Sequence, residues 1–326
     1  MTCRRQKVLF IGGLGRSGST LVERLLNELP TTFAVGETIH LWERGVRNGE
    51  TCGCGAPFDD CAHWRAVGSA AFGGWDRVDA DRLIELRWAV DRTRQLPAIT
   101  LAHRRGQPGG DQRDYLDHLR RVLLAAAVVA GRPDVLLDSS KHLSTAALLA
   151  LDDALDVRLL HLVRDPRGVA YSWTKHVARP ETDGEVMPTY DPARTAARWV
   201  TDNLGFEALG RWVPTLRLRY EDVLTDPRAA LAAIGRFVGI DVRGLDLGFI
   251  EGCSARLATP MHSVAGNPLR FGGDDVTLRL DDAWVTELGC GRRRLVTSLT
   301  APLLVRYGYP IRPAVSGRRR PDRCGR

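Results

Sequence analysis

A glycine-rich turn near the start of the chain carries residues that can bind an anion. The segment GLGRSGST follows the apolar run KVLFIGG and leads into the helical pattern STLVERLLNEL. A turn between a strand and a helix points several backbone N–H groups, and the positive end of the helix, at one place where a phosphate-like group can sit. The residues expected to contact this anion are Arg16, Ser17, Gly18, Ser19 and Thr20.

The turn shares only part of the pattern of the loops that hold nucleoside triphosphates. Gly13 and Gly18 have the required spacing, but Ser19 stands where those loops have lysine. Phosphoryl transfer needs that lysine and a carboxylate-held Mg²⁺ to neutralise developing charge. Here the cation comes earlier, as Arg16, which suits a smaller anion such as a 5′-phosphosulfate. A tight turn without a ligand is the alternative for this segment taken alone.

A second segment, HLVRDPRGVAYSW, has the residues for a second phosphate. Arg164 ends an apolar strand-like run, Pro166 is well placed to open a helix, and Ser172 follows Arg164 by eight residues. An arginine at a strand end and a serine on the next helix can together hold a phosphate. The alternative is an Arg164 that only forms a salt bridge with Asp165 or another neighbour.

Together these segments resemble the sulfotransferases that use 3′-phosphoadenosine-5′-phosphosulfate (PAPS). GRSGST is similar to the 5′-phosphosulfate loop of that family, and RDPRGVAYS to its 3′-phosphate motif. RYEDVLTDP resembles a third landmark, which implies that Tyr220 lies near the adenine. HSVAGNPLRF is similar to the C-terminal nucleotide-binding segment of bacterial members, which implies further contacts from Gly266, Asn267 and Arg270. The resemblance covers residues 7–271 in the family's order and implies a bacterial-type, PAPS-dependent sulfotransferase.

Two positions differ from the cytosolic animal members of this family. Those members have lysine where Arg16 stands and tryptophan where Leu21 stands. Arginine keeps the charge and can hold an anion with two N–H groups, whereas leucine cannot stack on adenine as an indole does. The C-terminal glycine-rich segment of the animal enzymes has no recognisable counterpart. The adenine contacts are therefore not identified from the sequence.

Sulfuryl transfer is an in-line displacement at sulfur that needs a base and cations but no metal. Glu37, in AVGETIHLW, follows a predicted strand at the ligand side of the sheet, and a similar GE segment supplies the base in several branches of the family. His40, three residues on, is the alternative because histidine is the commoner general base, although it can instead pack beside Trp42. We expect Glu37 to be the base.

Lys141 is the expected catalytic cation. It follows the predicted strand PDVLLDSS in a chain whose other lysines are only Lys7 and Lys175. A compact ammonium can donate to the bridging oxygen of the donor, whereas an ion pair with Asp138 is the structural alternative. The neighbouring Ser139 and Ser140 either donate to the sulfuryl group or cap the next helix, and we expect at least one to cap it.

Three cysteines, Cys52, Cys54 and Cys61, lie within ten residues, and His63 follows two residues later. Zinc needs four ligands, and this spacing is an imperfect match to its usual patterns. Similar cysteine-bearing segments occur in bacterial relatives of the family, which need no metal for catalysis. We therefore favour a turn with packed thiols over a zinc site or a disulfide.

The elements that carry these residues alternate between strand and helix. Strands are predicted at residues 7–13, 33–37, 133–140, 157–164 and 215–220, and helices at 19–29, 141–155, 166–178, 226–239 and 292–308. Residues 79–131 are mostly helical around a loop at 96–110. This order predicts an α/β fold, a P-loop-like three-layer αβα domain with a central parallel sheet of about five strands. We expect one domain over residues 1–312 and a disordered basic tail over 313–326.

Loop-like stretches at 96–111 and 178–192 are expected to cover the acceptor. Their mixture of Arg, His, Pro and Gly suits a polar hydroxylated acceptor, such as a saccharide, a glycolipid or a natural product, without choosing among them.

Composition narrows the alternatives. The net charge is +7, but the basic residues are scattered and show no stripe interleaved with aromatic residues, so we expect no nucleic-acid partner. The apolar runs are too short to span a membrane, and the first one is too short for a signal peptide, which predicts a cytoplasmic protein. A P-loop nucleotide kinase or NTPase is the second hypothesis, and a non-catalytic nucleotide-binding protein is the third. The sequence does not indicate an oligomeric state.

Overall fold

A five-stranded parallel sheet forms the centre of the protein in the computed structural model, which describes residues 5–178, 186–241, 244–271 and 275–312. The strand order is β2-β3-β1-β4-β5, and every neighbouring pair is parallel. The strands are β1 (Gln6–Gly12), β2 (Thr32–Gly36), β3 (Val135–Lys141), β4 (Leu155–Val163) and β5 (Thr215–Arg219). All five lie where the sequence predicts them.

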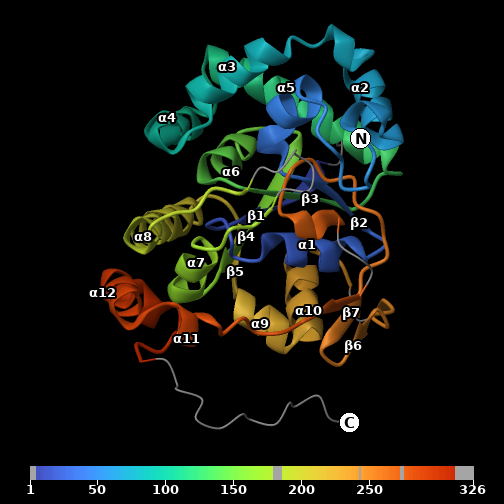
Figure 1. Ribbon diagram of the computed structural model, residues 1–326. Coiled ribbons are helices and arrows are strands. Elements are labelled where there is room, and N and C mark those ends of the chain that lie inside the picture. The colour runs from blue at the N-terminus through green and yellow to red at the C-terminus, as the bar shows by residue number, and fades with distance from the viewer. Residues whose placement is uncertain (1–4, 179–185, 242–243, 272–274, 313–326) are drawn as a thin grey trace.

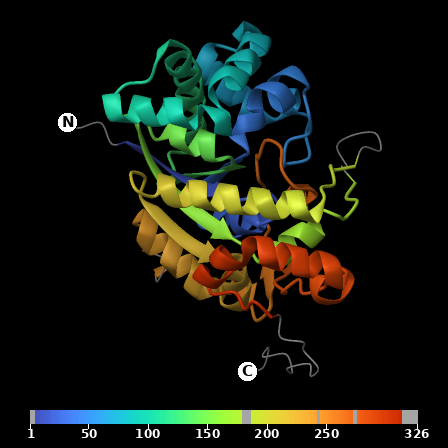
Figure 2. The same cartoon turned by 90° about the vertical axis from the view of Figure 1, so that its left-hand side faces the viewer.

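Helices cover both faces of this sheet (Figures 1 and 2). The larger apolar cluster joins one face to α5 (Gly110–Val129), α6 (Leu143–Leu149) and the end of α8 (Pro192–Leu209). A second cluster joins the opposite face to α1 (Ser19–Asn27) and α10 (Pro227–Val238). The remaining helices are α2 (Ala62–Phe72), α3 (Ala80–Val90), α4 (Leu96–Arg105), α7 (Pro166–Ser172), α9 (Tyr220–Thr225), α11 (Trp284–Glu287) and α12 (Cys290–Arg306).

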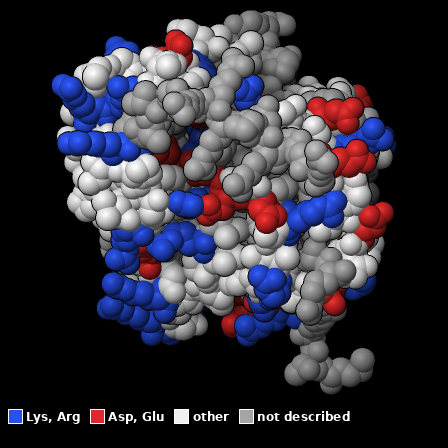
Figure 3. Space-filling model, turned by 90° about the horizontal axis from the view of Figure 1, so that it is seen from below, with Lys and Arg blue, Asp and Glu red and all other residues white. Residues whose placement is uncertain are grey.

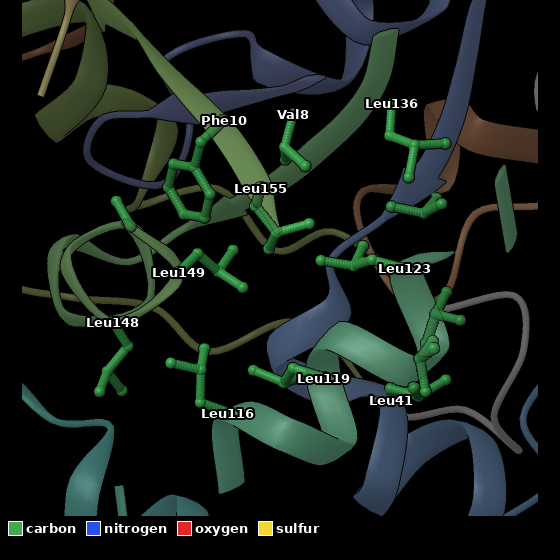
Figure 4. Packing of buried hydrophobic residues seen from close by; sticks show 14 of the residues in the cluster. Val8, Phe10, Leu41, Leu116, Leu119, Leu123, Leu136, Leu148, Leu149 and Leu155 are labelled. Carbon is green, nitrogen blue, oxygen red and sulfur yellow. The ribbon is translucent and has the colours of Figure 1, made fainter. Parts of the chain in front are cut away.

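The alternation of side chains along β1 explains why two helical layers form. Val8 and Phe10 pack in the first cluster, where Figure 4 shows them near Leu149 and Leu155. Leu9 and Ile11, which point the other way in a strand, pack in the second cluster. A strand that is apolar on both faces must be covered on both. The three-layer αβα architecture predicted from the sequence is confirmed.

Several local predictions differ from the structure. Residues 96–105, expected as a loop, form α4, because Pro97 lies in the first turn, where proline is tolerated, and Ile99 and Ala102 are buried. The helix expected over 141–155 is shorter, since α6 ends at Leu149 and β4 begins at Leu155. Two features were not predicted: α8 and a small antiparallel sheet of β6 (Ile250–Glu251), β7 (Ser254–Arg256) and β8 (Asp275–Thr277).

No helix in the described ranges combines the length and the apolar character needed to cross a membrane. The tail predicted to be disordered, residues 313–326, lies outside the described residues. The single domain over 1–312 stays a prediction.

Candidate active site

The glycine-rich turn links the end of β1 to α1. Its backbone takes left-handed conformations at Arg16 (φ 73°) and at Gly18 (φ 89°), the residue directly before α1. A Cβ atom at Gly18 would lie 2.1 Å from the ring of Tyr220, so no larger residue fits there. Tyr220 therefore packs directly on the turn.

Arg164 lies beside this turn because β4 is the neighbour of β1. Its guanidinium donates to the carbonyl of Arg16 (2.9 Å), forms an ion pair with Asp281 (3.3 Å) and lies 5.1 Å from the Tyr220 ring centre. Asp165, the partner considered from sequence, pairs instead with the fully buried Arg167. The geometry leaves Arg164 facing the same space as the turn.

Two guanidinium groups meet at this place. Burial, and then repulsion from the nearby Arg164, lower the pKa of Arg16. Each positive charge is therefore destabilised by the other. The Nε atom of Arg16 is buried and has no hydrogen-bond partner among the described residues. A negatively charged ligand would relieve both costs, so the arrangement fits an anion with at least one phosphate-like group.

Glu37, Lys141 and His40 form a second group on the same cavity. The ammonium of Lys141 contacts Oε1 of Glu37, and Nε2 of His40 lies 3.7 Å from Oε2. Lys141 ends β3 with a left-handed backbone (φ 67°). The Glu37 amide donates to the carbonyl of Val264 (2.8 Å), so the loop near residue 264 fixes the position of the glutamate. Lys141 thus pairs with the expected base and not with Asp138.

A buried polar layer supports this group from below. Asp138 accepts hydrogen bonds from Thr38 and from the amide of Ser140, while Ser139 donates to Glu23 (2.8 Å). The two serines lie within β3, and His142 begins α6 without a side-chain cap. The prediction that one serine caps that helix is wrong, because the strand extends through both residues. Ser140 nevertheless lines the cavity.

Burial of Glu23 yields a pH-dependent stability prediction. Desolvation raises the pKa of Glu23 to about 8, so the folded protein holds this proton at pH values where the unfolded chain has lost it. Stability is then full at low pH and falls as the pH rises from about 5 through 8. Between pH 6 and pH 8 the unfolding free energy of the wild type should fall by about 2 kcal/mol more than that of Glu23→Gln, which has no proton to lose at this position. Urea unfolding of both proteins checks this, and parallel pH curves would contradict it.

One cavity of about 590 Å³ collects most of the predicted site. The predicted residues that line it are Arg16, Gly18, Ser19, Thr20, Glu37, His40, Lys141, Arg164, Ser172, Tyr220, Gly266 and Asn267. Ser17 and Arg270 are buried but do not line it; Arg270 donates to the carbonyl of Thr51 (3.1 Å) and supports the loop. Residues at or after the ends of all five central strands, together with a distant loop, thus face one space.

The cavity also has lining residues that the sequence analysis did not single out. Trp173 donates to the carbonyl of Gly15 (3.0 Å), and the Arg16 guanidinium lies 5.1 Å from its ring centre. Tyr190 packs on Trp173 with ring centres 4.7 Å apart. Trp173 directly follows the predicted site residue Ser172, and this position could have indicated from the sequence that it lines the cavity. Further lining residues are Arg44, Thr93, His142, Arg194 and Arg198.

His142 adds a neutral imidazole beside the expected base. Burial, helped by the nearby His40, lowers the pKa of His142 to about 3, so this ring stays uncharged at neutral pH. The rings of His40 and His142 meet edge to face at 6.4 Å.

The two predicted lids behave differently. Of the stretch 178–192, Met187, Pro188 and Tyr190 line the cavity, and residues 179–185 lie outside the described ones. The stretch 96–111 contributes no lining residue, because α4 packs against α6. That part of the lid prediction is wrong.

Comparisons with known proteins agree with this geometry. Residues 9–244 match the "Sulfotransferase family". The chain is 26% identical to carbohydrate sulfotransferase 5 of Mus musculus over 90% of its own length and 78% of that protein. The solved sulfotransferase domain from the curacin biosynthetic pathway is similar in fold, with a TM-score of 0.51 and 17% identity over 94% of this chain and 100% of that one. For the sulfotransferase domain of the Synechococcus PCC 7002 olefin synthase the TM-score is 0.47. The sequence identity is 23%, and the match covers 91% of this chain and 95% of that one. The chain belongs to the sulfotransferase family.

Proposed function

We propose that this sulfotransferase moves a sulfuryl group from PAPS to a hydroxyl or an amine of a small-molecule or saccharide acceptor. The observation that carries the proposal is the shared cavity, which joins two cationic phosphate-binding segments to a carboxylate and an ammonium. Arg164 donates to the Arg16 carbonyl, Lys141 contacts Glu37, and all four residues line the same cavity. This arrangement suits a donor that has two separate anionic ends.

The residues present have distinct tasks in such a reaction. Bound PAPS supplies a sulfuryl group on a phosphate that can leave. Arg164, with Ser172, holds the 3′-phosphate, and the turn with Arg16 holds the 5′ end. Glu37 takes the proton from the acceptor as the new bond to sulfur forms, and Lys141 donates to the departing bridging oxygen. No described side chain in this scheme requires a metal.

The acceptor side of the cavity supports a polar substrate. His142 and Arg198 line the cavity, with His142 near Glu37, and Tyr190 lines it beside Trp173. Together they combine aromatic surface with hydrogen-bonding groups. Such a surface suits the ring faces and hydroxyls of a sugar. The similarity to a protein named carbohydrate sulfotransferase supports the same choice. A saccharide or a glycosylated molecule is therefore the acceptor class that we would test first.

Removal of Arg164 tests the 3′-phosphate assignment. Arg164→Ala deletes a charge-assisted contact that is worth about 1.5–3 kcal/mol, so the affinity for 3′,5′-diphosphoadenosine should fall about 10- to 150-fold. Arg82→Ala is the control, since Arg82 forms an exposed ion pair with Glu85 on α3. Calorimetric titration of both variants checks the prediction, and an unchanged affinity in Arg164→Ala would contradict it.

Calorimetry with the wild-type protein tests the proposed function itself. We expect tight binding of 3′,5′-diphosphoadenosine and no heat from ATP with Mg²⁺. The reverse result would favour the nucleotide kinase hypothesis. Binding of 3′,5′-diphosphoadenosine with no transfer from PAPS to any member of a saccharide panel would favour a non-catalytic nucleotide-binding protein.

We do not propose a nucleic-acid partner. The face shown in Figure 3 carries acidic as well as basic side chains, and the basic ones gather toward its left edge. A surface that mixes both charges disfavours a polyanion along its length.

A further inference from the structure

Three cysteines and a distant histidine converge on one point outside the proposed active site. The ligand atoms of Cys52, Cys54, Cys61 and His262 all lie within 4.8 Å of one another. The sulfur atoms of Cys54 and Cys61 are 3.7 Å apart, and the Cys61 sulfur lies 3.3 Å from Nδ1 of His262. His63, the histidine considered from sequence, is not in this group.

The sulfur–sulfur separation of 3.7 Å and the sulfur–nitrogen separation of 3.3 Å are close to the edges of a zinc tetrahedron. With Zn–S bonds of about 2.3 Å and Zn–N bonds of about 2.0 Å, neighbouring sulfurs lie about 3.8 Å apart and a sulfur and a nitrogen about 3.5 Å apart. Three cysteines and one histidine are a complete ligand set for a structural zinc site. The three cysteines are free thiols, so none is committed to a disulfide.

The surroundings hold the four ligands in place. Backbone N–H groups of Cys54 and Trp64 donate to the sulfurs of Cys52 and Cys61 and fix the positions of both side chains. The His262 ring stacks on that of His63 at 4.9 Å, and its carbonyl accepts a hydrogen bond from Trp64 (2.8 Å). Cys52 and Cys61 are buried, whereas Cys54 is exposed and leaves a path for the ion.

We propose that Cys52, Cys54, Cys61 and His262 bind a structural Zn²⁺ that fastens the loop around His262 to the segment 51–61. The loop already contacts this segment, because the amide of Gly53 donates to the Ser263 carbonyl (3.0 Å). The same loop supplies Gly266 and Asn267 to the cavity and holds Glu37 through Val264. The ion stabilises the loop and takes no part in the transfer reaction.

Zinc analysis of the full chain tests this proposal. Protein purified under reducing conditions without chelator should contain about one zinc ion per chain, as measured by inductively coupled plasma mass spectrometry. After removal of the metal, titration with Zn²⁺ against a coloured chelator should restore the same ratio. Co²⁺ in place of zinc should give the absorption bands of a tetrahedral thiolate site.

Two variants separate metal binding from folding. Cys54→Ser changes an exposed ligand and should weaken zinc binding about 100-fold or more, while Cys290→Ser, at an exposed thiol on α12, should leave it unchanged. Zinc should raise the melting temperature of the wild type but not that of Cys54→Ser. A zinc content near zero, an equal content in both variants, or a peptide mass showing a disulfide within residues 52–61 would each overturn the proposal.

Discussion

Glu37→Gln is expected to lower kcat for sulfuryl transfer about 10²- to 10⁴-fold. Glutamine has the size of glutamate and can still accept hydrogen bonds, but it cannot take the acceptor's proton. Glu37 is held from three sides, by Lys141, by His40 and through its amide by Val264, so the substitution should leave the shape of the site intact. The affinity for 3′,5′-diphosphoadenosine should therefore change less than about threefold.

The comparison with His40→Gln decides between the two candidate bases. Rates with saturating PAPS and acceptor are measured for both variants and for Glu85→Gln, an exposed α3 glutamate that serves as the control. A severe loss in Glu37→Gln with a smaller loss in His40→Gln supports Glu37. If the glutamine variant keeps its rate while His40→Gln loses it, the proton goes to the imidazole instead.

Lys141→Met should give the second large effect, a fall in kcat of about 10²- to 10³-fold. Methionine keeps the length of the side chain but removes the charge that would neutralise the bridging oxygen. The bridging oxygen leaves with 3′,5′-diphosphoadenosine, so the affinity for this product should fall too. The rate of the chemical step should fall as well, because that oxygen gains its negative charge as the S–O bond breaks.

The control for this experiment is Lys7→Met. Lys7 lies on β1, at the opposite end of the strand from the turn, and donates to the carbonyl of Val238 (2.8 Å). Its loss should lower stability and leave kcat within about threefold. Single-turnover rates in both lysine variants check the prediction, and equal rates in Lys141→Met and the wild type would contradict it.

The central sheet was predictable because its strands are short runs of Val, Leu and Ile that need cover on both faces. The turn with Arg16 and the pair Arg164 and Ser172 were predictable for a related reason, since each follows its strand directly in the chain. A strand end and the next residues carry both their position and their chemistry in local sequence.

Contacts across long sequence separations were not predictable in the same way. His262 meets Cys61 although 201 residues separate them, and Asp281 meets Arg164 across 117. A single sequence carries no local signal for either pair. The helix α4 was missed for a different reason, because Pro97 and the Gly-containing residues after it resemble a loop while the burial of Ile99 depends on tertiary packing.

The bond between the Glu37 amide and the Val264 carbonyl has a consequence for how the enzyme comes into being during synthesis. The strands of the central sheet are complete once the ribosome has passed Arg219, but the segment that secures Glu37 is made later. A nascent chain can therefore build its core before the carboxylate that we propose as the base is fixed. Closing a contact so distant in sequence costs chain entropy, so we expect transfer activity to arise only when nearly all of the chain has left the ribosome.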